Sequence, residues 1–271
     1  MCELFAMSSR VPANVNFSLE EFSRHGGLTG PHKDGWGVAF YGDKDVRLIK
    51  EPEPASDSDC ARFIAKHHWR SRIVISHVRR ATQGARTLEN TQPFARELGG
   101  HMQVFAHNGD LGAVRQQTHL RLGRFRPVGE TDSEYAFCVL LAWMEERWLS
   151  AGPPPLAERL DLVARFAAAI RPLGPANFLY ADGEFLFVHG HRRRHEGQTG
   201  YHPPGVHTLH RTCAAELSAV SVPGLHIATA SGPQEVVLAA SVPLTMEPWT
   251  PAPEGAVIAI ANGHVVARAD P

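Results

Sequence analysis

A cysteine follows the initiator methionine in MCEL, the first four residues of the chain. A thiol is mostly protonated at neutral pH and needs a base before it can attack a carbonyl carbon. An α-amino group, with a pKa of about 7.7–8.0, is partly neutral near pH 7 and can act as that base. Because a small residue follows Met1, we expect Met1 to be removed, which would place the amine and the thiol together on Cys2. The sequence therefore predicts an N-terminal cysteine nucleophile.

Asn108 and Gly109, in FAHNGDL, could stabilise the negative oxygen that forms when a thiolate attacks an amide carbonyl. The asparagine offers a side-chain NH₂ group, and the glycine offers a backbone N–H that no Cβ obstructs. The same dipeptide also favours a hairpin turn. The pair is thus a candidate oxyanion hole, with a plain turn as the alternative.

Other residues suit the far end of a glutamine-like substrate, which carries a carboxylate and an ammonium group. Arg79, in SHVRRAT, could bind the carboxylate with its fork of donors, and Thr82 could add a hydroxyl. Chemistry alone leaves the choice between Arg79 and Arg80 open. Asp132 is expected in the first turn of a helix, where free N–H groups favour its charged form, and it could hold the ammonium. A surface arginine and an ordinary first-turn aspartate are the structural alternatives.

Composition bounds the class of protein. The 271 residues are 43% hydrophobic, which suits a single layered domain, expected over residues 2–271. A net charge of −1 argues against a nucleic-acid or membrane partner. The sequence shows no long apolar run or secretory signal, so we expect a cytoplasmic protein with reduced thiols. Without CxxC or HExxH motifs, we expect neither a metal nor another cofactor.

Hydrophobic periodicity predicts the elements that must position these residues. Strands are expected at residues 2–7, 35–41, 46–51, 72–79, 102–107, 177–183, 184–190, 205–210, 225–230 and 256–268, the last as a hairpin. Helices are expected at residues 59–69, 130–149 and 155–170, with capping boxes at Thr131–Glu134 and, for a further short helix, Ser18–Glu21. Strands, two central helices and more strands predict two sheets with helices packed outside them.

Six motifs in order give the chain a resemblance to the class II glutamine amidotransferases, which are N-terminal-nucleophile (Ntn) hydrolases. The motifs are MCEL, GPHKDGWGVAFY, SHVRRAT, ENTQPF, FAHNGDL and FRPVGETDSEYAF. The chain most resembles the stand-alone bacterial branch, the YafJ type, strongly over roughly the first 150 residues. The resemblance implies an α+β fold, a four-layer αββα sandwich of Ntn-hydrolase type, with two mostly antiparallel sheets between helix layers.

The resemblance also implies roles for the candidate residues. Cys2 would be the mature N-terminus and nucleophile. Asn108 and Gly109 would form the oxyanion hole, and Asp132 would hold the substrate ammonium. Arg79, which takes the place of the motif arginine and so is preferred to Arg80, would hold the carboxylate, with Thr82 beside it.

Three further residues, His77, Asp34 and Gly35, match the motifs as possible supporting residues; His77 is equally expected to be structural. The chain also departs from the family pattern. His32–Lys33 precedes Asp34–Gly35 where many relatives have Arg-Gly, and Gln83 and Gln92 stand where histidine is common. These departures concern the loops around the substrate.

The predicted activity is hydrolysis of glutamine or another γ-glutamyl amide through a thioester on Cys2, releasing ammonia or an amine. The sequence shows no acceptor-domain signature, so an acceptor enzyme could join in trans. Alternatively, the protein could trim a γ-glutamyl group from a biosynthetic intermediate, as relatives in ergothioneine synthesis do. A third alternative is a non-catalytic binding module using the basic stretch at residues 189–202, although a solvated loop is the expected state of that stretch.

Overall fold

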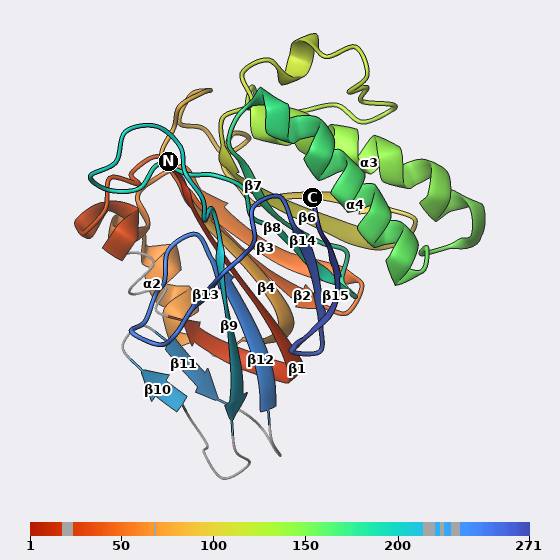
Figure 1. Ribbon diagram of the computed structural model, residues 1–271. Helices are drawn as coiled ribbons and strands as arrows, with labels where there is room; N and C mark the ends of the chain where they lie inside the picture. The colour runs from red at the N-terminus through yellow and green to blue at the C-terminus, as the bar shows by residue number, and fades with distance from the viewer. Residues whose placement is uncertain (18–23, 68, 214–219, 223–224, 229–233) are drawn as a thin grey trace.

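Two antiparallel β-sheets form the centre of the structure, a computed structural model that describes residues 1–17, 24–67, 69–213, 220–222, 225–228 and 234–271 (Figure 1). In the described residues, the first sheet runs in the order β13-β9-β12-β1-β4-β2-β3, and β11, which pairs with β10, also pairs with β1. Its strands are β1 (Glu3–Phe17), β2 (Trp36–Gly42), β3 (Asp45–Glu51), β4 (Arg70–Val78), β9 (His207–Cys213), β10 (Val220–Val222), β11 (Leu225–Ala228), β12 (Gln234–Ala240) and β13 (Thr250–Pro251).

The second sheet runs in the order β15-β14-β8-β7-β6-β5. Its strands are β5 (Phe94–Leu98), β6 (His101–Gly109), β7 (Ala176–Ala181), β8 (Leu186–His189), β14 (Val257–Ala261) and β15 (His264–Ala269). The helices and helical turns are η1 (Arg24–Leu28), η2 (Ala55–Asp57), α2 (Asp59–Lys66), η3 (Val114–Gln116), α3 (Asp132–Ala151), α4 (Leu156–Ile170) and η4 (Arg171–Leu173).

Alternating side chains divide each long strand between two layers of the core. In β1, Leu4 and Ala6 face the second sheet, whereas Phe5 and Met7 lie on the opposite face, which α2 covers. In β6, Val104 and Ala106 likewise point between the sheets. The other face of the second sheet packs against α3 and α4, which lie side by side (Figure 1).

The layers are therefore α2, first sheet, second sheet, and α3 with α4. This arrangement confirms the α+β fold expected from the resemblance. The two helix layers are unequal, because α2 has 8 residues while α3 and α4 have 20 and 15. In the described part of the chain, no helix is long and apolar enough to cross a membrane.

The predicted elements correspond to observed ones, with several differences in extent. The strand predicted at residues 2–7 continues to Phe17, because its later residues find partners in β4 and β11. The helix predicted at residues 59–69 ends at Lys66, where His67 takes an extended conformation. The sequence also missed β5, β10, β12 and β13, which are held by pairing with longer neighbours. The Ser18–Glu21 prediction lies outside the described residues.

Half of the capping box at the start of α3 is present. The Thr131 hydroxyl accepts a hydrogen bond from the Glu134 backbone N–H at 3.2 Å. The Glu134 carboxylate does not reach back to the cap, because it accepts a hydrogen bond from the Gly129 N–H at 2.7 Å. The start of α3 is thus fixed against the loop before it, and Asp132 is the first helical residue, as predicted.

Candidate active site

The predicted functional residues gather at one end of the sandwich, where several strand ends meet. Cys2 directly precedes β1, and the register between β1 and β4 pairs Glu3 with Val78. This register places Cys2 beside the residues that follow β4. The Cys2 Sγ lies 3.4 Å from both the backbone nitrogen and the carbonyl oxygen of Arg80.

The environment of Cys2 acts in opposite directions on the thiol and the α-amine. Burial raises the pKa of the Cys2 thiol, although the Arg80 N–H and the Arg79 cation favour the thiolate. Burial lowers the pKa of the Met1 α-amine below its usual value, and the cations of Arg80 and Arg193 act in the same direction. Burial thus favours the neutral form of both the Cys2 thiol and the Met1 α-amine.

Polar groups surround Met1 on two sides. Its carbonyl oxygen lies 2.7 Å from His32 Nε2, and its Sδ accepts from the Arg194 backbone N–H at 3.0 Å.

The buried Glu3 carboxylate bonds His25 Nδ1 at 2.8 Å. Burial opposes ionisation of Glu3 more than any single group favours it, but the His25 hydrogen bond together with the nearby His32, His25 and Arg193 charges lowers the pKa of Glu3. A charged carboxylate thus lies one residue from the nucleophile.

Asn108 and Gly109 are the last two residues of β6, not a hairpin turn. They pair with Asn177 and Ala176 of β7. A Cβ at position 109 would lie 1.7 Å from the Pro175 carbonyl oxygen, so close packing of the strands requires glycine there. The alternative of a plain turn is therefore wrong.

The Asn108 side chain is completely buried, and Ser241 holds it in place. Its Nδ2 donates to the Ser241 Oγ at 3.3 Å, while its Oδ1 has no hydrogen-bond partner among the described residues. The same Ser241 Oγ accepts from the Leu4 N–H at 2.8 Å, and the Ser241 N–H donates to the Leu4 carbonyl at 3.0 Å. Ser241, just after β12, thus connects the Asn108 amide to the start of β1.

Asp132 is buried, and donors from two elements hold its carboxylate. Its Oδ2 accepts from the Leu111 N–H at 2.6 Å and its Oδ1 from the Ser133 N–H at 2.8 Å. The Ser133 hydroxyl lies 2.9 Å from His107 Nδ1, and burial lowers the pKa of His107, so its ring is neutral. Asp132 lies close enough to Cys2 to affect the thiol electrostatically.

Arg79 is buried and donates to backbone carbonyls of the two loops beside it. Its Nη1 reaches the carbonyl oxygens of Ala85 at 2.9 Å and Asp34 at 3.3 Å, and its Nη2 reaches those of Gln83 at 2.9 Å and Gly84 at 3.1 Å. In this geometry the guanidinium fixes the loop that carries Thr82, whose side chain is exposed. Binding of a substrate carboxylate by Arg79 stays a prediction.

Asp34 and Gly35 join the loop before β2 to the end of β4. The Asp34 Oδ2 accepts from the Ala81 N–H at 2.8 Å, and the Gly35 carbonyl accepts from the Arg79 N–H at 2.7 Å. Gly35 has φ of +126°, a conformation that side chains rarely adopt. The place of both residues is consistent with a supporting role.

His77 lies fully buried within β4, and burial lowers its pKa well below the usual value. Neither ring nitrogen has a hydrogen-bond partner among the described residues. A neutral ring enclosed in the core fits a structural role better than contact with substrate.

The basic stretch at residues 189–202 differs from the expected solvated loop over its first part. The His191 N–H donates to Asn177 Oδ1 at 2.7 Å, and Arg193 Nη1 donates to the Ser241 carbonyl. Backbone pairing between Arg193 and His202 closes the loop. Residues 191–193 therefore pack onto the strand ends around Asn108, while most of the remainder is exposed.

Sequence reasoning missed Ser241, Arg193, Ser133 and His107 as parts of this site. Ser241 has a weak signal, since it is the first polar residue after the apolar run VVLAA. Arg193 is one of three consecutive arginines, and only the fold distinguishes it from its neighbours.

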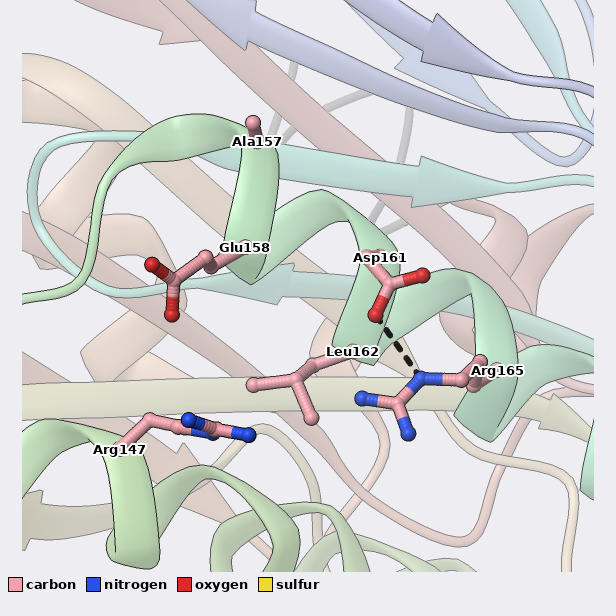
Figure 2. A pocket seen from close by; sticks show the side chains of 6 residues that line it. All are labelled: Arg147, Ala157, Glu158, Asp161, Leu162 and Arg165. Atoms are coloured by element: carbon pink, nitrogen blue, oxygen red, sulfur yellow. Dashed lines mark hydrogen bonds and ion pairs between the residues drawn. The ribbon is translucent and has the colours of Figure 1, made fainter.

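A separate surface hollow of about 370 Å³ lies between α3 and α4 (Figure 2). It is lined by Arg147, Ala157, Glu158, Asp161, Leu162 and Arg165, and Asp161 pairs with Arg165 at 2.9 Å. These residues lie on the outer helix layer and include none of the candidate site, so the hollow is not part of it.

Two sheets between helix layers, with Cys2 at the start of a central strand, give this protein the architecture of the Ntn hydrolases. A sequence model described as "Glutamine amidotransferases class-II" matches residues 1–271. The chain belongs to this family.

Individual relatives agree with the family assignment. The chain is 41% identical over 209 residues to "Putative glutamine amidotransferase YafJ" of Escherichia coli, covering 77% of this chain and 80% of the relative. It is 31% identical over 269 residues to a "Putative glutamine amidotransferase" of Haemophilus influenzae, covering 99% and 87%. These relatives support turnover of the glutamine amide in general terms.

Solved structures support the same fold. A crystal structure described as a "predicted glutamine amidotransferase" from Pseudomonas aeruginosa PA01 matches with a TM-score of 0.69 at 31% identity, covering 98% of this chain and 100% of the other. The glutamine phosphoribosylpyrophosphate amidotransferase of B. subtilis matches with a TM-score of 0.58 at 15% identity. The second match covers 96% of this chain but 47% of the other and concerns the fold alone.

Proposed function

We propose that the protein hydrolyses the γ-amide of glutamine, or of a related γ-glutamyl amide, through a γ-glutamyl thioester on Cys2. The observation that carries the proposal is that Arg79 and Asp132 lie close enough to act electrostatically on the Cys2 thiol, while Ser241 connects Asn108 to Leu4, two residues from Cys2. We further propose that residues 2–271 form one catalytic domain once Met1 has been removed.

In the first proposed half-reaction, the neutral α-amine of Cys2 takes the thiol proton. The thiolate attacks the γ-carbon, and the carbonyl oxygen becomes negatively charged. Asn108 Nδ2 and the Gly109 N–H stabilise this oxygen by donating hydrogen bonds to it. The protonated α-amine of Cys2 then gives its proton to the amide nitrogen of the substrate. The C–N bond breaks, and ammonia or an amine leaves.

In the second half-reaction, the amine takes a proton from water, and the hydroxide attacks the thioester carbon. The C–S bond breaks, the thiolate recovers the proton, and glutamate is released. The oxyanion groups serve both steps, because each passes through a tetrahedral intermediate. Every step uses only groups of this chain, the substrate and water.

The two ends of the substrate would be held by opposite charges. Asp132 would bind the α-ammonium with a carboxylate that two backbone donors hold in place. Arg79 and Thr82 would lie at the α-carboxylate. Arg79 would either give up a hydrogen bond to a loop carbonyl and bond the carboxylate instead, or donate to the carboxylate through Nε. His77, Asp34 and Gly35 would act as supports.

A second candidate is removal of a γ-glutamyl group from a larger amide with an anionic leaving group. The cations of Arg80 and Arg193 both act on the Met1 α-amine, so after removal of Met1 they would lie near the Cys2 amine, which protonates the leaving nitrogen in the proposed mechanism. A carboxylate on the leaving group would meet this positive region. If ammonia is instead transferred, an acceptor enzyme would have to join in trans.

The test combines turnover with labelling of the matured protein. Intact mass first establishes that Met1 has been removed, and glutamate release is then measured with glutamine and with a panel of neutral and anionic γ-glutamyl amides. Cys2→Ala keeps the α-amine and removes the thiol, so we expect turnover to fall by at least about 10⁴-fold with an unchanged circular dichroism spectrum. An electrophilic glutamine mimic should label Cys2 alone.

Cys60→Ala is the matched control, because Cys60 is also partly exposed but lies on α2. It should retain both turnover and labelling. Normal turnover by the Cys2→Ala protein would rule out the proposal.

A further inference from the structure

Three potential metal ligands meet on the surface, away from Cys2. They are His210 on β9, Glu235 on β12 and His264 at the start of β15, and one ligand atom from each lies within 4.8 Å of the others. Because β9 and β12 belong to the first sheet and β15 to the second, the cluster connects the two sheets. The sequence separations of these residues match no metal motif, so only the fold brings them together.

The backbone fixes the positions of all three residues. Pairing of β9 with β12 sets Thr212 opposite Glu235 and His210 opposite Val237. His210 Nε2 lies 2.9 Å from Glu235 Oε2, which also accepts from the Thr212 hydroxyl at 2.9 Å. The Glu235 carboxylate is thus oriented toward His210.

The turn before β15 is pressed against β12. A Cβ on Gly263 would lie 2.1 Å from the Glu235 carbonyl oxygen, so glycine allows the close approach that brings His264 beside Glu235. The Gly263 N–H also donates to the Ser8 hydroxyl of β1 at 3.3 Å. The turn therefore cannot move away from the first sheet without losing these contacts.

We propose that His210, Glu235 and His264 form a zinc site. Two imidazoles and one carboxylate are a common ligand set for Zn²⁺, and water can fill the fourth position. Neighbouring ligand atoms around tetrahedral zinc lie about 3.4 Å apart, given bonds of about 2.1 Å. Both histidines are exposed, so side-chain rotation can contract the cluster and the ion can enter directly.

The site acts on stability and has no part in amide hydrolysis. Glu235 lies six residues before Ser241 along β12, a separation of about 20 Å for an extended strand. A bound ion would cross-link the two sheets at the end opposite the nucleophile. It binds the folded chain selectively, because the three ligands lie far apart in sequence.

The test is a titration of the full-length Cys2→Ala protein, whose nucleophilic thiol cannot compete for the metal. With Zn²⁺ alone, calorimetry should show one site, and Co²⁺ should give the visible absorption of tetrahedral nitrogen and oxygen ligation. His264→Ala should weaken zinc affinity by more than about 10-fold and remove the zinc-dependent rise in Tm. His119→Ala, at an exposed histidine outside the cluster, should change neither.

The contact between His210 and Glu235 separates a zinc site from a simple surface contact. His264→Ala leaves that contact in place, so a cluster that serves only to join His210 and Glu235 would show the same zinc response with and without His264. Equal affinities for the two proteins, or no zinc binding by Cys2→Ala, would overturn the proposal. Circular dichroism of each variant checks that the fold is retained.

Discussion

Asn108 and Asn177 are opposite each other in adjacent strands, yet their surroundings differ. Asn177 Nδ2 donates to the carbonyls of Asn108 at 3.0 Å and Arg192 at 2.7 Å, and its Oδ1 accepts from the His191 N–H at 2.7 Å. Asn108 has one side-chain hydrogen bond, to Ser241, and its Oδ1 has no partner among the described residues. A buried polar atom without a partner costs about 1–3 kcal/mol. Asn177 supports the fold through all three bonds, whereas Asn108 Nδ2 makes one bond among the described residues and can donate its second hydrogen to the proposed oxyanion.

The same division separates two regions of the molecule. The first 132 residues supply the groups proposed to touch the substrate: Cys2, Arg79, Asn108 and Asp132. The later strands and loops supply Asn177 and Ser241, which bond Asn108, and Arg193, which bonds the Ser241 carbonyl. Substitutions in the first region should therefore impair turnover more than stability, and those in the second should reverse that order.

Asn108→Ala should produce the largest effect of this comparison. Loss of one oxyanion donor costs about 10²–10³-fold in kcat. KM should change little, because the donor interacts more weakly with the neutral carbonyl of the bound substrate than with the negative oxygen of the transition state. Steady-state glutamate release measures both constants. The free energy of unfolding should fall by less than about 1.5 kcal/mol, because only one hydrogen bond is lost.

Asn177→Ala is the matched comparison for that substitution. It removes three hydrogen bonds and leaves buried groups without partners, so urea denaturation should show a loss of about 3 kcal/mol or more. Its kcat should exceed that of Asn108→Ala by at least about 10-fold. If Asn177→Ala were the slower enzyme, the division between reacting and supporting residues would fail.

Asp132→Asn should chiefly raise KM, because it removes the charge that would meet the substrate ammonium while preserving size. A hydrogen bond to a charged group contributes about 1.5–3 kcal/mol, which predicts a loss of about 10- to 100-fold in kcat/KM. Asp182→Asn is the control, since Asp182 is equally buried but pairs with Arg159 at 2.9 Å. That variant should lose stability and keep its KM; an unchanged KM for Asp132→Asn would contradict the assignment.

The sequence predicted the residues proposed to react better than the supporting ones, for a physical reason. Cys2, Asn108–Gly109 and Asp132 are recognisable because their proposed chemistry restricts residue type, and the fold places Asp132 near Cys2 and connects Asn108 to Leu4 through Ser241. The support from Ser241 depends on β12 pairing with β1, a contact across more than 200 residues that no local pattern specifies. For Arg79 the sequence suggested a role that the structure does not show. An arginine suits a substrate carboxylate, but its Nη1 and Nη2 donate to backbone carbonyls of the neighbouring loop.

Ser241→Ala tests whether a supporting residue can affect catalysis by orienting Asn108. Losing the hydroxyl frees the Asn108 amide to rotate, and we expect kcat to fall about 10-fold, the equivalent of one hydrogen bond, with KM unchanged. In the Asn108→Ala background the same substitution should have little effect on kcat, which a double-mutant cycle measures. Additive losses would show that Ser241 acts otherwise. Ser71→Ala is the control for loss of a buried hydroxyl, because Ser71 is buried at the end of β4 that lies away from Arg79.

Arg193→Ala should have the smallest effect, confined to the acidic side of the pH profile. The neutral amine is the active base, so kcat/KM rises with pH through the amine pKa and levels off above it. Burial, together with the Arg80 and Arg193 cations, holds the pKa of the Met1 α-amine below its usual value, and we expect the same groups to act on the α-amine of Cys2 once Met1 is removed. Removing Arg193 should raise the amine pKa and shift this limb to higher pH, leaving the alkaline plateau nearly unchanged. Arg193→Lys keeps the charge and should keep the limb in place. A purely structural contact has no reason to change the pKa of the base. A lower alkaline plateau of kcat/KM, with the acidic limb at the same pH, would therefore mean that Arg193 affects the site only through the Ser241 carbonyl.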